Sequence, residues 1–160
     1  MKNQLLERIL SNRRCFRIIQ WTWGFPQTMS GALLYLRYYH QPHMEYHGSV
    51  VTIWPHESSM SLGMYIFLSD KNRYQMKKGN ISVHDHSKTM RLLMHEYGHS
   101  IQSILCGPFY MLAVGLPSAV WNKLPVFHRT RKKKNISYFS VYPEKQADKL
   151  GNRYLWKEST

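Results

Sequence analysis

The chain has 160 residues, 43% of them hydrophobic and 14% aromatic, which is enough for one domain with a substantial core and excludes disorder throughout. Its formal net charge of +13 is compatible with binding to nucleic acid, with an anionic membrane surface or with solubility alone. The two cysteines, Cys15 and Cys106, are too few for a disulfide framework. We therefore predict a single domain over residues 1–160.

The N-terminal part of the chain contains an uncharged, largely apolar stretch, residues 18–36. The basic residues that flank it are Lys2, Arg8, Arg13, Arg14, Arg17 and Arg37. Basic residues beside an apolar stretch are typical of membrane-associated chains. Because Gly24 and Pro26 interrupt the stretch, it lacks the pattern of a clean transmembrane helix or of a signal peptide. We expect membrane association, with a cytoplasmic location as the alternative.

β-Branched and aromatic residues predict a small sheet in the middle of the chain. Residues 49–54 have the composition of a strand, which Pro55 ends. Residues 61–68 predict a second strand followed by a turn, and residues 81–83 predict a third. The edge of such a sheet can pair with an extended peptide.

Residues 85–105 have the pattern of one long helix. Its apolar residues recur at helical spacing: Met90, Leu93, Met94, Tyr97, Ile101, Ile104 and Leu105. Asp85 or Ser87 can cap the amino end by accepting a hydrogen bond from a free backbone amide. Gly107 and Pro108 predict the carboxyl end, since glycine tolerates the left-handed cap and proline cannot continue the hydrogen-bond ladder.

This helix contains an H-E-x-x-H motif, from His95 to His99. Residues four apart lie on one face of a helix, so both imidazoles can bind one metal ion. Glu96 lies beside them and is predicted to act as general base on a metal-bound water. The motif is typical of zinc hydrolases. The alternative is a buried helix with two incidental histidines, although such side chains are costly to bury without partners.

Residues 100–122 are again uncharged, but glycine and proline at 107–108 and 115–117 break them into pieces typical of buried or re-entrant segments. Residues 123–137 are predicted to form a basic loop with a cluster of five basic residues at 129–134. Three interpretations of this cluster remain open: a solvated loop, a contact with anionic lipid, and a contact with nucleic acid. No zinc-finger, helix-turn-helix or RNA-binding signature supports the last.

A catalytic zinc site needs a third protein ligand and leaves its fourth position to water. Position 105, where one extended form of the motif has a third histidine, is Leu105, so we expect an acidic ligand from a later segment. The acids that follow the motif are Glu144, Asp148 and Glu158. Glu144 and Asp148 are four residues apart, at the start of a helix that Pro143 is suited to open.

Glu144 is therefore predicted to bind the zinc. Asp148 is predicted to accept a hydrogen bond from the far nitrogen of a ligand histidine, which would fix the tautomer and orientation of that ring. Ala147 is small and would let this helix approach the first one closely. The alternative for the two acids is a solvated face on a short charged helix.

The two motifs together, H-E-x-x-H at 95–99 and E-x-x-A-D at 144–148, resemble those of the gluzincin zinc metallopeptidases. The second is most similar to that of the membrane endopeptidases that include the CAAX prenyl-protein protease and the bacterial heat-shock membrane protease. Residues 95–118 also resemble small, uncharacterised bacterial metallopeptidases. The resemblance is confined to residues 95–118 and 143–151. It implies the same roles: zinc ligands His95, His99 and Glu144, base Glu96, and histidine partner Asp148.

These predictions combine into an α+β, zincin-like domain with an active-site helix, a second metal-ligand helix, a small sheet and apolar segments that meet a membrane. The predicted function is hydrolysis of peptide bonds in a peptide or protein substrate by a zinc-activated water. Two alternatives remain: a membrane-associated protein that binds zinc without catalysis, and a basic protein associated with nucleic acid. An anionic membrane surface is the second expected partner.

Overall fold

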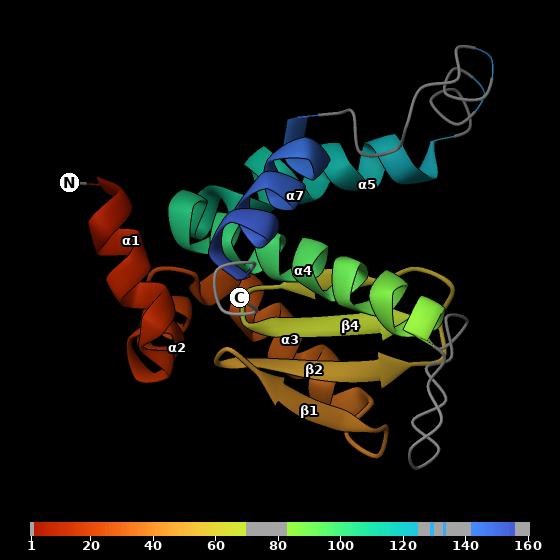
Figure 1. Ribbon diagram of the computed structural model, residues 1–160, viewed down its shortest axis with the longest axis horizontal. Coiled ribbons are helices and arrows are strands. Elements are labelled where there is room, and N and C mark those ends of the chain that lie inside the picture. The colour runs from red at the N-terminus through yellow and green to blue at the C-terminus, as the bar shows by residue number, and fades with distance from the viewer. Residues whose placement is uncertain (1, 70–82, 125–128, 130–132, 134–141, 156–160) are drawn as a thin grey trace.

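A computed structural model describes residues 2–69, 83–124, 129, 133 and 142–155 (Figure 1). Within these residues the chain has a mixed, α+β architecture with six α-helices and one four-stranded sheet. The elements in chain order are α1 (Lys2–Ser11), α2 (Arg13–Thr22), α3 (Phe25–Arg37), β1 (His43–Tyr46), β2 (Ser49–Trp54), β3 (Met60–Leu62), β4 (Tyr65–Ser69), α4 (Val83–Cys106), the 3₁₀-helix η2 (Gly107–Phe109), the π-helix η3 (Met111–Gly115), α5 (Leu116–Lys123) and α7 (Tyr142–Leu155).

The sheet has the strand order β1-β2-β4-β3, with β2 and β4 parallel and both outer strands antiparallel to their neighbours. The predicted strand at 49–54 is confirmed as β2. The prediction of one strand over residues 61–68 is wrong, because the chain reverses at Gly63 and forms two strands, β3 and β4. Gly63 has a φ of +62°, which glycine adopts without a steric penalty and which suits the first position of a two-residue hairpin turn.

The long predicted helix is confirmed as α4, which crosses the sheet in Figure 1. It ends at Cys106 as expected, and Gly107 has a φ of +55°. The predicted cap is wrong, because α4 begins at Val83 and both Asp85 and Ser87 lie inside it. Of the predicted strand at 81–83, Val83 is helical and the other two residues lie outside the described part of the chain.

The core fills the space between α2, α4 and the sheet. Its fully buried apolar side chains include Phe16, Val51, Ile66, Tyr97 and Ile101. The rings of Phe16 and Tyr97 stack with their centroids 5.8 Å apart, which ties α2 to the middle of α4. The apolar face of α4 is therefore held against the rest of the molecule, and its His95–His99 turn has a defined position.

Helix α7 packs directly across α4, and the residues at the crossing are small. A β-carbon at Gly98 would overlap the carbonyl group of Ala147, and one at Gly151 would overlap the carbonyl group of Met94. Ala147 itself is fully buried, which confirms the predicted close approach of the two helices. The close approach depends on Gly98 and Gly151 as much as on Ala147. The sequence did not point to the two glycines.

The first uncharged stretch forms the second half of α2 and most of α3, and the second forms the end of α4 with η2, η3 and α5. Across the described ranges, none of the helices combines the length and the apolarity that crossing a lipid bilayer requires. Most of the predicted basic loop at 123–137 lies outside the described residues; Arg129 and Lys133, which are described, are exposed.

Candidate metal centre

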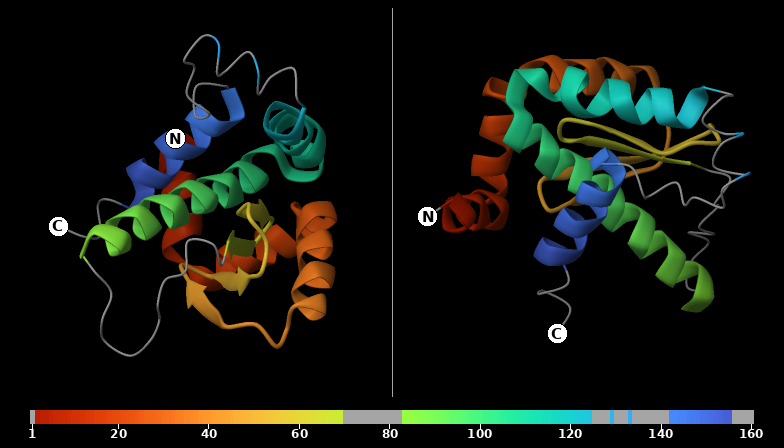
Figure 2. Two further views of the ribbon diagram at one scale, coloured as in Figure 1. Left: turned by 90° about the vertical axis from the view of Figure 1, so that its right-hand side faces the viewer. Right: turned by 90° about the horizontal axis from the view of Figure 1, so that it is seen from above.

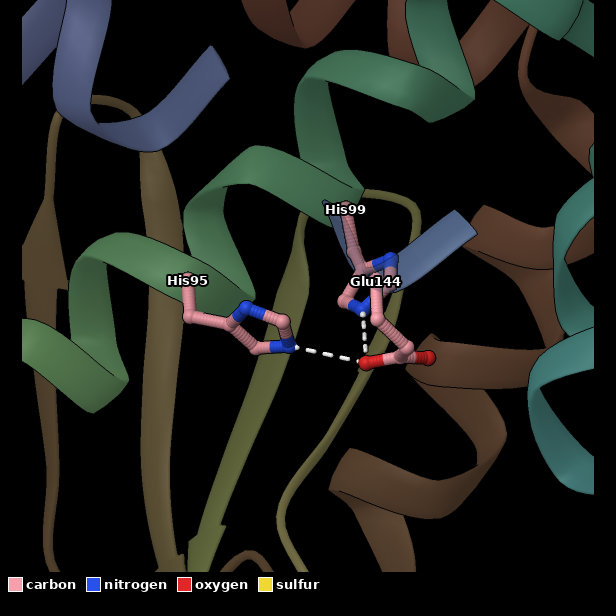
Figure 3. Close-up of side chains that lie close together, drawn as sticks. All are labelled: His95, His99 and Glu144. Carbon is pink, nitrogen blue, oxygen red and sulfur yellow. Dashed lines mark hydrogen bonds and ion pairs between the residues drawn. The ribbon is translucent and has the colours of Figure 1, made fainter. Parts of the chain in front are cut away.

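Three buried side chains converge between α4 and α7 (Figure 3). His95 and His99 extend from the same face of α4, and Glu144 extends from the first turn of α7. Nε2 of His95 lies 3.1 Å from Oε2 of Glu144, and Nε2 of His99 lies 3.5 Å from the same oxygen. The structure thus brings together the three residues predicted as metal ligands, which are 49 positions apart at their extremes.

The three donor atoms lie close enough together to hold one metal ion. Their coordinating atoms all lie within 4.8 Å of one another. Atoms bound 2.0–2.2 Å from a tetrahedral zinc ion are separated by about 3.3–3.6 Å, close to the distances of 3.1 and 3.5 Å from Oε2 of Glu144 to the two histidine nitrogens. Two imidazole nitrogens and one carboxylate oxygen are also a ligand set that zinc accepts in hydrolytic enzymes.

Asp148 orients the first histidine. Its Oδ1 lies 2.7 Å from Nδ1 of His95, one turn of α7 after Glu144. Nδ1 is therefore the nitrogen that donates a proton to Asp148, and Nε2 is directed to Glu144. The position of Asp148 agrees with its predicted contact to the far nitrogen of a ligand histidine.

Gln102 orients the second histidine, although sequence reasoning did not identify it. Its side-chain nitrogen donates to the backbone oxygen of Pro143 at 2.8 Å, so its carbonyl oxygen faces Nδ1 of His99, at 2.7 Å. Nδ1 of His99 must then carry a proton, so a tautomer able to bind a metal has its Nε2 lone pair directed at Glu144. A lone pair and a carboxylate oxygen 3.5 Å apart repel each other unless a proton or a metal cation lies between them.

The electrostatics of the site favour a positive charge between the two histidines and Glu144. Burial lowers the pKa of His95, but hydrogen bonds to Glu144 and Asp148 and the charge of Glu96 outweigh it and raise this pKa to about 9. Burial also acts to raise the pKa of Glu144, yet the hydrogen bond from His95, the interaction with His99 and the hydrogen bond from Ser118 hold it well below its usual range. Glu144 is therefore ionised at neutral pH, as a metal ligand must be.

Ser118 completes the environment of Glu144. Its hydroxyl group donates to Oε1, the carboxylate oxygen that does not face the histidines. Ser118 lies on α5, so the carboxylate is held from a third helix. This contact leaves Oε2 as the oxygen available to a metal ion.

Glu96 lies beside the histidines on α4 and is 4% exposed. The hydroxyl oxygen of Ser61, on the edge strand β3, lies 2.7 Å from its Oε2 and 2.7 Å from its backbone oxygen. Burial raises the pKa of Glu96, against the opposing effect of both histidines and of the Ser61 hydroxyl. A carboxyl group with a raised pKa exchanges protons more readily near neutral pH than an ordinary glutamate does.

Behind Ser61 lies a second buried hydroxyl group. Tyr110 is 3% exposed, and its phenol donates to the backbone oxygen of Ser61 at 3.4 Å. Burial and the charges of Glu96 and Glu144 raise the pKa of Tyr110 far above its usual value, so the phenol stays neutral. It therefore supports the strand that positions Glu96 without adding a charge.

Sequence reasoning missed three of these contacts: Ser61, Gln102 and Ser118. Gln102 had a detectable signal, since it follows His99 by three residues and so shares its face of α4. Ser118 belongs to the segment that entered the resemblance above, but nothing local connected it to Glu144. Ser61 had no signal at all, because its role depends on the hairpin that places β3 beside α4.

No protein-family model matches the chain, and neither a curated protein nor a solved structure matches it significantly. The arguments about its function therefore rest on the side chains described above.

Proposed function

We propose that this protein is a zinc-dependent metallopeptidase with a zincin-like catalytic domain of the gluzincin type. The observation that carries the proposal is the convergence of His95, His99 and Glu144, which lie on two helices and direct their donor atoms to one point. The hydrogen bonds that the two imidazoles donate to Asp148 and Gln102 support it, because they fix both rings with Nε2 directed at that point.

Each residue has a defined role in this proposal. His95, His99 and Glu144 would hold the zinc ion, which would supply a Lewis acid and lower the pKa of a bound water to about 7. Glu96 takes a proton from the attacking water and delivers it to the amine that leaves as the peptide bond breaks. Ser61 keeps the Glu96 carboxylate in one orientation for both transfers.

The proposed substrate is a peptide or protein segment in extended conformation. Of the two edge strands, β3 lies beside Glu96 through Ser61, whereas β1 lies at the opposite edge of the sheet. A polypeptide that adds to a sheet edge presents its backbone in a regular register. We propose that the substrate binds on the β3 side of the sheet, next to Glu96.

The decisive experiment compares wild type with Glu96→Gln in zinc content and in cleavage of a broad library of quenched fluorescent peptides. We expect both proteins to bind one zinc ion, because Glu96 is not a ligand. We expect Glu96→Gln to lose at least about 100-fold in kcat/KM, because proton transfer contributes about 10²–10⁴-fold to such reactions. Glu45→Gln, at an exposed glutamate paired with Arg17, is the matched control.

Two results would contradict the proposal. Activity that survives in Glu96→Gln would remove the assigned general base. Stoichiometric zinc in a wild-type protein that cleaves no peptide in the library would leave a zinc-binding protein without catalysis. The cellular location of the proposed enzyme is a separate question. It depends on the exposed side chains of the molecule and not on the residues of this site.

A further inference from the structure

Helix α3 has polar residues on its buried side and large apolar residues on its exposed side, the reverse of an ordinary helix in a water-soluble protein. Its buried side includes the polar residues Gln27 and Thr28, which are fully buried. Its exposed side carries four large apolar residues at helical spacing: Phe25, Met29, Leu33 and Leu36. Leu33 is 62% exposed and Leu36 is 67% exposed. Helices at a water-facing surface show the opposite pattern.

The second uncharged stretch has the same inversion. Ser100, Gln102 and Ser103 are fully buried at the end of α4. The exposed side chains that follow are apolar: Leu105, Phe109, Leu112 and Leu116 are between 50% and 68% exposed. Twelve of the 18 large apolar side chains exposed in the described part of the chain belong to the two uncharged stretches. An isolated exposed leucine needs no explanation, but a concentration of them in segments without any charge does.

The two stretches meet and form one surface. The indole nitrogen of Trp23 donates to the backbone oxygen of Ile104 at 3.1 Å, and Gln27 donates to the backbone oxygen of Gly107 at 3.0 Å. Both views of Figure 2 place α3 and the segment from η2 to α5 on the same side of the molecule. We call the exposed apolar side chains of residues 18–36 and 105–116 the apolar face.

The polar groups beneath the apolar face bond to one another. Gln20 donates to the backbone oxygen of Ser100 and accepts from Ser103, and Gln27 donates to Ser103. Within the described residues, Gln27 Oε1 and Ser100 Oγ are the side-chain atoms below the face that lack a hydrogen-bond partner, and the other polar atoms of this group are satisfied inside the protein. Proteins that contact lipid hydrocarbon need this arrangement, because lipid chains offer no hydrogen bonds.

We propose that the apolar face inserts into one leaflet of an anionic lipid bilayer. Charge complementarity favours this occupant over a second copy of the chain, since two molecules of net charge +13 repel each other. Exposed Arg14 and Arg37 flank the first stretch, where anionic headgroups would meet them. Trp21 and Trp23, 37% and 52% exposed, are of the residue type that favours the membrane interface. The proposal is independent of the reaction proposed above.

The test measures binding of the purified protein to vesicles of phosphatidylcholine with 30% phosphatidylglycerol by sedimentation. We expect wild type to bind, and to remain partly bound at high salt, because apolar insertion is not screened by ions. The double substitution Leu33→Gln and Leu36→Gln should weaken binding about tenfold or more without changing the net charge. The matched control, Leu5→Gln with Met44→Gln, alters exposed apolar residues outside the face and should stay within twofold of wild type.

A second measurement takes its main result from the wild-type protein. Lipids brominated on their acyl chains quench tryptophans that lie among the chains, so we expect quenching in wild type and loss of most of it in Trp21→Phe with Trp23→Phe. Absence of quenching would overturn the proposal. So would binding that disappears in high salt and is unaffected at Leu33 and Leu36, which would be electrostatic alone. A dimer in lipid-free solution that the Leu33 and Leu36 substitutions dissociate, without any vesicle binding, would assign the face to a second copy.

Discussion

Ser61 positions the proposed general base from outside the motif. Its hydroxyl group is 2.7 Å from the Glu96 carboxylate, and it favours the ionised form of that side chain. We expect Ser61→Ala to keep zinc and to lower kcat about 10–100-fold, since a hydrogen bond to a charged group contributes about 1.5–3 kcal/mol. Its loss also raises the pKa of Glu96, so the acidic limb of the pH–rate profile should move to higher pH.

The pH profile separates positioning from a general loss of structure. Ser61→Thr retains the hydroxyl group and should recover much of the activity with the original profile. Ser11→Ala removes an exposed hydroxyl group on α1 that donates to the neighbouring backbone oxygen of Arg8, and should match wild type. An unchanged acidic limb in Ser61→Ala would show that Ser61 does not act through Glu96.

Asp148 acts on the proposed metal centre through His95. Its carboxylate holds Nδ1 at 2.7 Å and thereby fixes the tautomer that presents Nε2. Asp148→Asn removes the charge but keeps the size, and we expect zinc affinity to fall about 10–100-fold. Competition with a fluorescent zinc chelator measures this difference. Affinity within twofold of wild type would mean that His95 is oriented by its packing and not by Asp148.

At the scale of the elements, the crossing of α4 and α7 determines whether the ligands meet. Gly98→Ala would force a β-carbon into the backbone of Ala147. We expect it to lower the free energy of unfolding by about 1–3 kcal/mol and to weaken zinc binding, because overpacking shifts the two helices apart. Urea denaturation and chelator competition measure the two effects.

Gly115→Ala is the control for this substitution. Its β-carbon would meet Met111 Sδ at 3.6 Å, an ordinary contact, and its backbone is helical with φ −61°. Alanine favours helical backbone over glycine by about 1 kcal/mol, so the variant should be as stable as wild type or slightly more stable. If Gly98→Ala and Gly115→Ala lowered the free energy of unfolding equally, the helix crossing would be no more sensitive to an added β-carbon than Gly115 is.

At the scale of the whole molecule, zinc should stabilise the native state, because the unfolded chain does not hold the three ligands together. Free zinc at 100 times the dissociation constant contributes about 2.7 kcal/mol, equivalent to a rise in Tm of about 5–10 °C for a domain of this size. A chelator should reverse this rise. His95→Ala should abolish it, whereas His40→Ala, at an exposed histidine, should retain it. A rise that persists in His95→Ala would place the zinc elsewhere.

The parts of the structure that were predictable depend on neighbours in the chain. The limits of β2, the carboxyl end of α4 and the shared face of His95 and His99 follow from composition and helical spacing. The division of residues 60–69 into β3 and β4 could not be predicted from composition. An apolar run with one glycine is equally compatible with a single strand. It is the pairing of Leu62 with Tyr65 that makes the chain reverse there.

The sequence by itself therefore determined the residue types of the proposed metal ligands and the helix that carries two of them, because helical periodicity is a local property of the backbone. Only the tertiary structure decided that Glu144 reaches the histidines, that Ser61 holds Glu96, and that Ser118 occupies the second oxygen of Glu144. It also decided that the apolar residues of α3 face outward and the glutamine inward. These outcomes depend on which helices and strands pack together, and that is set by contacts between residues that are far apart in the chain.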